Sequence, residues 1–558
     1  MQRVLRTVIL ALWAATIFGN SASLLDILSG ELERNFRVLH EKGDPPAYYI
    51  AYAVTDQESH NVGATLGALQ VASHASSRWL DVTVRVGSPE LDNYHRLSGD
   101  RFAFSSAVRL PLENVPAAIC QRLWMDTDGT YRRAAERLIK VRTAAQVKAV
   151  EADSAADFSK EEPAIYEDAP QPLEFSPQDW QDRVRKWSAA FGRYPRILAS
   201  SVSVSAQLET KYLVTSEGSR IEQGKGLARI ALSAQTKAPD GMDLTSEESF
   251  ESETVRGLPG DKEVLGAVER VAKELTALLS APDAEPFVGP AILSGRAAGV
   301  FFHEIFGHRI EGHRQNDETE GQTFAKAVGT KVLPDFLSVF SDPTIRKLHG
   351  VDLSGHYLYD DEGVKARRVT VVESGILRNF LLSRSPMPGF DHSNGHGRRQ
   401  PGFDVVSRQS TLIVESSKTV DEARLRGLLI EEIRRQKKPY GLYFEKVTGG
   451  YTQTSRRGLQ AYTVVPIIVY RVYADGRPDE LVRGADIVGT PLASFSKILA
   501  ASDQPGVFNG YCGAESGSLP VSAVAPSLLV SEIEIQKKEK GQDRPPLLPA
   551  PSGEWRSH

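Results

Sequence analysis

The spacing of apolar residues along the chain predicts an α+β fold. Helical spacing, with apolar residues three or four positions apart, recurs over about 25–39, 115–150, 176–187 and 261–279. Alternation of apolar and polar residues predicts antiparallel strands between these helices, at 48–55, 79–86, 197–206 and 211–215. Residues 153–172 are acidic, contain proline and show no periodicity, so we expect a surface linker there.

From about residue 285 onward the pattern becomes mostly β. Strands are expected at 369–373, 376–382, 411–415, 441–447, 462–473 and 528–535, and one helix at 420–436. We therefore expect an N-terminal α+β domain with an antiparallel sheet over 24–285. A mostly β, catalytic C-terminal domain carrying a distorted metal-binding helix should cover 286–536. Residues 537–558 are charged and rich in proline, which predicts a disordered tail.

Residues 1–23 have the pattern of a secretory signal peptide. Two arginines in the first six residues precede an apolar run, Val8–Phe18, and small residues follow at 21–23. The run is too short for a comfortable membrane span. We therefore expect a periplasmic or secreted protein with no stable membrane span after cleavage. An uncleaved N-terminal anchor is the alternative.

Composition sets further bounds on the function. The chain has 558 residues, of which 41% are hydrophobic and 25% charged, as in ordinary soluble proteins of two or three domains. The net charge of −5 argues against a nucleic-acid partner, which would require a basic surface.

Residues 303–308 read His-Glu-Ile-Phe-Gly-His and predict a metal site. His303 and His308 would hold a divalent ion, usually zinc, and Glu304 would accept a proton from the water that the ion polarises. In an ideal helix, side chains five positions apart point about 140° apart and cannot share one ion. The spacing therefore predicts a local distortion, a single π-type turn that Gly307 would tolerate.

The alternative is a helix whose histidines are solvated or satisfied in the core. The residues before the motif, Pro290–Phe302, are largely apolar, and Ser294 is suited to cap the start of a helix there. Unpaired imidazole and carboxylate groups would be costly in such surroundings, and a bound metal would offset that cost.

Two other polar segments are candidates for the site. His396 and Arg398 lie in the glycine-containing stretch 394–399, where a mobile cationic loop could bind a substrate carboxylate or the oxyanion. A solvated polar turn is the alternative there. The carboxylates at 360–362 could hold a ligand imidazole, or could instead cap a turn at Gly363.

The segment around residue 303 resembles the TldD/PmbA metallopeptidases, a family also called modulator of DNA gyrase. The resemblance covers roughly 190–536 and is carried by 289–294, 297–312, 360–363, 394–398, 449–450, 511–513 and 518–521, with a short upstream match at 216–218. TldD-type members keep the H-E-x-x-x-H site and are active, whereas PmbA-type partners lack it. Because His303, Glu304 and His308 are present, the chain resembles the active type.

The resemblance implies that Cys512 is the third protein ligand. Cys512 stands between Gly510 and Gly513, in what reads as a flexible turn, and a thiolate is a favourable zinc ligand. The alternative is a disulfide with Cys120, the only other cysteine, because an exported chain meets an oxidising compartment. Glu311 and His313, just after the motif, are competing ligand candidates.

These observations together predict an exported zinc-dependent peptidase. His303, His308 and Cys512 would hold Zn²⁺, a metal-bound water would be the nucleophile, and Glu304 would be the general base. The resemblance implies small or unfolded peptide substrates, held as an added strand in an enclosed site. It also implies a homodimer or a heterodimer with a PmbA-like chain. The alternatives are a catalytically silent scaffold subunit of such a dimer and a structural metal-binding exported protein.

Overall fold

The computed structural model describes residues 23–97, 107–147, 155–317, 319–456, 461–490, 494–541, 544–546 and 548. The expected signal peptide, apart from residue 23, and most of the expected tail lie outside these residues. No helix within the described residues is long and apolar enough to cross a membrane.

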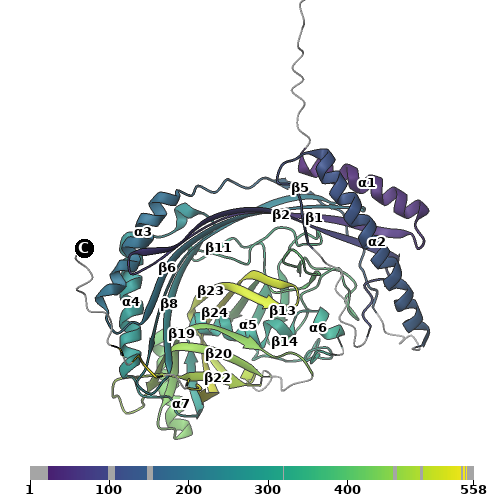
Figure 1. Cartoon of the computed structure of the whole chain (residues 1–558). Helices are drawn as coiled ribbons and strands as arrows, with labels where there is room; N and C mark the ends of the chain where they lie inside the picture. The colour runs from purple at the N-terminus through teal and green to yellow at the C-terminus, as the bar shows by residue number, and fades with distance from the viewer. Residues whose placement is uncertain are drawn as a thin grey trace, which may run out of the picture.

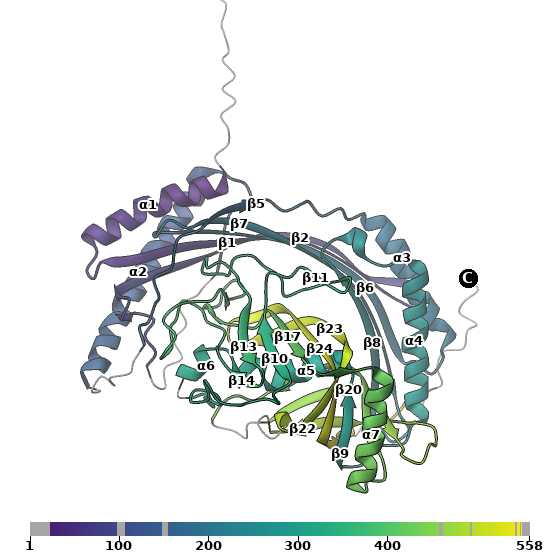
Figure 2. The same cartoon turned by 180° about the vertical axis from the view of Figure 1, so that it is seen from behind.

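The N-terminal part is built on one large curved sheet (Figures 1 and 2). Within the described residues its eight strands run in the order β3-β2-β1-β6-β7-β5, with β4 beside β2 and β8 beside β7. Only the contact between β5 and β7 is parallel. The strands are β1 (Ala47–Thr65), β2 (Ala68–Ser88), β3 (Leu91–Asp92), β4 (Val108–Arg109), β5 (Ile165–Asp168), β6 (Ala199–Thr215), β7 (Arg220–Lys237) and β8 (Asp243–Ser252).

Helices cover the outer, convex face of this sheet, whereas its inner face turns toward the C-terminal part of the chain (Figures 1 and 2). The alternation of side chains along the strands explains this arrangement. Val204 and Ile230 pack in the outer core beneath the helices. Arg229 and Ser233 lie on the opposite, inner face. The helices are α1 (Leu24–Lys42), α2 (Pro116–Val147), α3 (Pro177–Ala189) and α4 (Asp261–Ser280), with short 3-10 turns η1 (Ala190–Arg193) and η2 (Val255–Gly257).

The C-terminal part contains a second sheet, which has twelve strands in the described residues. They are β9 (Phe287–Leu293), β10 (Leu337–Ser341), β13 (Val369–Glu373), β14 (Ile376–Leu377), β17 (Thr411–Ser416), β18 (Thr419–Val420), β19 (Gly441–Thr452), β20 (Tyr462–Val472), β21 (Glu480–Val482), β22 (Ala485–Gly489), β23 (Ile498–Ala514) and β24 (Gly517–Lys537). Strand β24 pairs with both β22 and β9, and β20 pairs with both β22 and β19. Because β9 also pairs with β19, these five strands close into a barrel-like ring.

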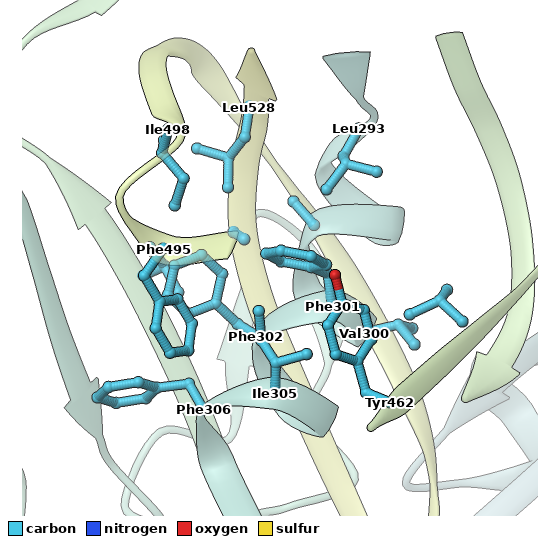
Figure 3. Packing of buried hydrophobic residues seen from close by; sticks show 14 of the residues in the cluster. Leu293, Val300, Phe301, Phe302, Ile305, Phe306, Tyr462, Phe495, Ile498 and Leu528 are labelled. Carbon is cyan, nitrogen blue, oxygen red and sulfur yellow. The ribbon is translucent and has the colours of Figure 1, made fainter. Parts of the chain in front are cut away.

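The remaining elements are short or pack against the second sheet. They are α5 (Gly295–Ile305), η3 (Gly307–Arg309), α6 (His313–Asn316), α7 (Glu422–Gln436) and the strand pairs β11 (Lys347–Leu348) with β12 (Val351–Asp352) and β15 (Gly397–Arg398) with β16 (Val406–Ser407). Helix α5 packs on β19, β23 and β24. Its phenylalanines lie in the main core, together with Tyr462 and Phe495 (Figure 3). The architecture confirms the α+β class expected from the apolar pattern.

Two stretches differ from the sequence predictions. The expected surface linker at 153–172 includes β5, which extends the sheet, and the buried Phe158, which packs against Tyr49. The linker prediction is therefore wrong. A strand that joins an existing sheet edge needs few apolar residues of its own, so the segment lacks the alternating pattern that would predict a strand. The start of the expected disordered tail is also ordered, since Lys537 ends β24 and Lys540 forms an ion pair with Asp283 at 2.7 Å.

Candidate metal centre

Helix α5 is fixed at its start by contacts with the second sheet. At its start, the Ser294 hydroxyl accepts a hydrogen bond from Ala297 N at 3.3 Å and donates one to Glu445 O at 2.9 Å. A Cβ on Gly295 would lie 2.4 Å from Gly506 N. Only glycine therefore allows α5 to approach β23 so closely. This contact sets the distance between the helix and the strand that carries Cys512.

The helix ends between the two histidines of the motif. Helix α5 ends at Ile305, and His308 lies in the short 3-10 turn η3. The break brings the ring centroids of His303 and His308 within 5.1 Å of each other. The expected distortion is present, but its predicted form is wrong, because the helix terminates and tightens instead of widening into a π-turn.

Gly307 has a packing role in this break. A Cβ on Gly307 would lie 1.8 Å from Oε1 of Gln409, so a side chain there would displace the glutamine. Gln409 in turn donates a hydrogen bond from Nε2 to the His303 carbonyl at 3.2 Å. No feature of the sequence singled out Gln409, because its contact with the motif spans about a hundred residues.

Three ligand atoms converge beside this turn. The side chains of His303, His308 and Cys512 are buried, and their ligand atoms all lie within 4.8 Å of one another. The Cys512 Sγ atom is 3.4 Å from His308 Nε2. Cys512 lies in the regular strand β23, opposite Leu519 of β24, and not in the flexible turn that its glycine neighbours suggested. Both cysteines are free, and Cys120 lies in α2, so the structure does not support the alternative disulfide.

The charges of these groups stabilise one another. Burial alone would raise the pKa of Cys512, but the two imidazoles hold it well below its usual range. Burial alone would lower the pKa of His308, but the Cys512 thiolate and the Glu311 carboxylate raise it well above its usual value. The Glu311 Oε2 atom is 3.2 Å from His308 Nδ1 and accepts a hydrogen bond from Arg314 Nε at 2.8 Å.

The side chains present fit a zinc ion. Two imidazoles and one thiolate are typical zinc ligands, and three protein ligands leave a fourth position for water or substrate. Among the described residues, His303 Nδ1 is a buried nitrogen without a hydrogen-bond partner. Such a group is rare unless something absent from the protein chain satisfies it. Glu311 orients His308 through the ring nitrogen that faces away from Cys512, as partners of metal-bound histidines do.

Glu304 lies beside the three converging groups, and all four side chains line one cavity. Burial raises the pKa of its carboxyl, whereas the nearby His303 and His308 side chains oppose that shift. A Cβ on Gly450 of β19 would lie 2.7 Å from Glu304 Cγ. The glycine pair 449–450 therefore includes one position where the absence of a side chain makes room for this carboxylate.

The cavity lies between the inner face of the N-terminal sheet and the C-terminal part of the chain. It has a volume of about 1010 Å³. One wall comes from β7 and β8, and the facing wall from α5, β19 and β23. Figure 1 shows β8 arching past β19, β20 and β23. The candidate metal centre thus opens into a cleft formed by both sheets.

His396 and Arg398, predicted to bind substrate, do not line this cleft. His396 is fully buried and is hydrogen-bonded to the Ser341 hydroxyl at 2.9 Å. Burial lowers its pKa to about 3, so its ring is neutral. Arg398 donates to the carbonyls of Gln409 and Pro520. The glycines around them permit close packing and not mobility, so we assign both side chains structural roles.

The remaining candidates also hold the fold around the site. Asp360 Oδ1 accepts hydrogen bonds from the amides of residues 362 and 364, which is the turn cap offered as an alternative. The His313 ring contacts the Glu515 carboxylate and does not join the three converging groups. Glu311 contacts the candidate ligand His308 at the ring nitrogen that faces away from Cys512, and is not itself one of the three converging groups. Its position three residues after His308 was the signal that could have assigned it this role.

Comparisons with known proteins identify relatives of the chain. Residues 288–537 match the family described as the PmbA/TldA metallopeptidase C-terminal domain. A metalloprotease of Methanocaldococcus jannaschii is 27% identical over 333 residues, which are 58% of this chain and 67% of that relative. A zinc metalloprotease TldD homolog of Saccharolobus solfataricus is 25% identical over 253 residues, 44% of this chain and 51% of that relative. The second match thus spans about half of that relative.

The whole fold also has a solved counterpart. The crystal structure of TldE from Thermococcus kodakarensis superposes with a TM-score of 0.60 at 15% identity. The superposition covers 91% of this chain and 99% of the TldE chain. At this identity the likeness establishes a shared fold.

Proposed function

We propose that this chain, which belongs to the TldD/PmbA metallopeptidase family, is an exported zinc-dependent peptidase of the active, TldD-like type. One observation carries the proposal: His303, His308 and Cys512 converge on one point, with Glu304 beside them on the wall of a large cleft. The intact Glu304 speaks against a silent scaffold subunit. The open cleft speaks against a purely structural metal site.

His303, His308 and Cys512 would hold the zinc ion. Bound zinc supplies Lewis acidity, which polarises a carbonyl group and lowers the pKa of water to about 7. Glu304 accepts the proton of the attacking water and returns it to the nitrogen of the departing amine. Its raised pKa suits this role, because a base works best when its pKa lies near the working pH. Glu311 keeps His308 in a fixed orientation.

The cleft walls offer free strand edges to an extended peptide. Among the described strands, β8 pairs only with β7, so its second edge is open beside the cleft. The stretch 449–452 of β19 pairs with β20 alone, because β9 reaches only residues 442–444. We propose that substrates bind as an added strand along such an edge, through main-chain hydrogen bonds. This mode accepts many sequences but requires an unfolded chain.

The partner and the compartment complete the proposal. The resemblance to paired TldD and PmbA chains supports a homodimer or a heterodimer with a PmbA-like chain. The N-terminal pattern of charge, apolar run and small residues supports export. Light scattering of the purified protein and N-terminal sequencing of the exported form test these two points. A monomer that is active alone, or an intact N-terminus on a cytoplasmic protein, would contradict them.

The metal assignment is tested by alanine variants of the three proposed ligands. His303→Ala, His308→Ala and Cys512→Ala should each lower bound zinc from one equivalent to a small fraction, because two ligands hold zinc far less tightly than three. Zinc is measured by mass spectrometry of the metal in dialysed protein. Full zinc content in the Cys512 variant would show that the third ligand is a different residue.

The reaction is tested with zinc-loaded protein on a permanently unfolded protein and on its native form. Wild-type protein should cleave the unfolded chain and spare the folded one. Glu304→Gln should keep its zinc and lose at least about 10²-fold in turnover. Glu445→Gln is the matched control, because Glu445 lines the same cleft away from the three ligands. Cleavage by Glu304→Gln near the wild-type rate would move the general base elsewhere. Equal cleavage of both substrates would contradict the enclosed site.

A further inference from the structure

The cations that line the cleft differ in whether a carboxylate pairs with them. The lining includes five of them: Arg229, Arg270, Arg296, Arg314 and Lys446. Four form ion pairs, with Glu251 at 3.3 Å, with Glu248, with Glu311 at 2.8 Å and with Glu274 at 2.8 Å respectively. Among the described residues, no carboxylate lies within ion-pair distance of Arg296. Its guanidinium lies 5.2 Å from the ring centroid of Phe508, which also lines the cleft.

This isolation has an energetic cost that a ligand could offset. A guanidinium stays charged in proteins, so partial burial removes hydration that only another polar group can replace. Burial lowers the pKa of Arg296, and the more distant Glu251 and Glu247 only partly oppose that shift. A planar guanidinium with a free hydrogen-bonding edge is matched by a carboxylate, which can accept two parallel hydrogen bonds.

Arg296 also lies at a defined distance from the metal centre. Arg296 and His303 are seven residues apart on α5, which is two helical turns, so they share one face of the helix. At about 1.5 Å per residue, their Cα atoms are separated by roughly 10 Å along the helix axis. An extended peptide covers about 3.3 Å per residue, so this distance corresponds to about three substrate residues. Val300, between them, lines the cleft as well.

We propose that Arg296 is a carboxylate-binding subsite, which holds a carboxylate of an extended peptide about three residues from the bond that is cleaved. The inference rests on the proposed function, because the spacing is counted from the metal centre. The carboxylate could be the C-terminus of the peptide, in which case short C-terminal fragments are released. It could equally be an aspartate or glutamate side chain within the peptide. Both sources present the same group to Arg296.

The test measures binding without turnover, in full-length, zinc-loaded Glu304→Gln protein. Three flexible peptides of equal length are compared by fluorescence anisotropy. The first has a free C-terminal carboxylate, the second a C-terminal amide, and the third an amide plus one internal glutamate. The free acid should bind about tenfold more tightly than the amide. Restored affinity with the third peptide would identify the side chain as a source, and unrestored affinity would identify the C-terminus. Both results support the subsite.

Substitutions show whether Arg296 causes the preference. Arg296→Ala should bring the three affinities within about twofold of one another, and Arg296→Lys should keep part of the difference. Arg270→Ala is the matched control, because Arg270 is a cation of the same cleft that already has a carboxylate partner, and it should preserve the preference. Zinc content and circular dichroism confirm that each variant is folded.

Two outcomes would overturn the proposal: equal binding of all three peptides by the parent protein, or an unchanged preference in Arg296→Ala. A wild-type protein that cleaves peptides could still show either of these two results. Conversely, a protein that cleaves no peptide could still prefer peptides that carry a carboxylate. Failure of the subsite is therefore distinguishable from failure of the peptidase assignment.

Discussion

Replacing Glu311 by glutamine should weaken zinc binding without removing a ligand. Glu311 is fully buried, lies 3.2 Å from His308 Nδ1 and accepts a hydrogen bond from Arg314 Nε at 2.8 Å. Glutamine keeps the shape but removes the charge that holds the His308 ring. Loss of such an outer partner typically costs 10–100-fold in metal affinity. At about 1.4 kcal/mol for each factor of ten, this corresponds to about 1.4–2.8 kcal/mol.

The affinity is measured by competition with a chromophoric zinc chelator at fixed pH and ionic strength. Glu515→Gln is the matched control, because Glu515 accepts a hydrogen bond from the same Arg314 at 2.8 Å but contacts neither His303 nor His308. The Glu311 variant should lose affinity, and the Glu515 variant should stay within about twofold of wild type. Wild-type affinity in Glu311→Gln, or an equal loss in both variants, would refute the idea that Glu311 acts through His308.

Two further predictions concern a glycine beside the base and a buried histidine. Gly450→Ala should lower turnover while zinc stays bound, because the new Cβ would lie 2.7 Å from Glu304 Cγ. Gly449→Ala is the control and should be near neutral, because its Cβ would meet no atom within 4 Å. Equal effects of the two substitutions on turnover would contradict this account. His396 has a pKa of about 3 when folded and about 6.5 when unfolded, so between these values the unfolded chain binds the extra proton and stability falls as the pH falls. Urea titrations give the free energy of unfolding of wild type and of His396→Gln. The difference between the two proteins should be smaller at pH 4 than at pH 7, by up to about 3 kcal/mol. A difference that is the same at both pH values would refute the neutral, buried state.

Helices were easier to predict from this sequence than strands. The leucines of α1 and the valines of α4 recur at helical spacing because one face of each helix packs on the sheet. Strands β7, β8 and β23 were missed. The first half of β7 carries glycines and charges, and β23 contains Pro505 and three glycines, which normally argue against a strand. In β23 these glycines serve contacts that only the folded chain reveals, such as that between Gly506 and Gly295.

The candidate site likewise contains residues that the sequence pattern identifies and residues that it does not. His303, Glu304 and His308 are adjacent in the sequence, so their local spacing was enough to single them out. Cys512 is 204 residues from His308, and only the resemblance to a family linked the two. The stretch around His396 was misinterpreted because glycines predict mobility and close packing equally well. A Cβ on Gly397, for example, would lie 2.5 Å from Glu362 Oε2.

The position of the N-terminal sheet over the metal centre is fixed by buried polar contacts between the two parts of the chain. Arg384 is only 2% exposed and donates to both carboxylate oxygens of Glu217, at 2.7 and 3.0 Å, and to the Ser159 carbonyl. Separating the two parts would break the ion pair with Glu217 and the hydrogen bonds to the Ser159 carbonyl together. The cleft is therefore a preformed space of about 1010 Å³. Such a volume admits an extended segment but not a folded domain, which is the physical basis for expecting selection of unfolded chains.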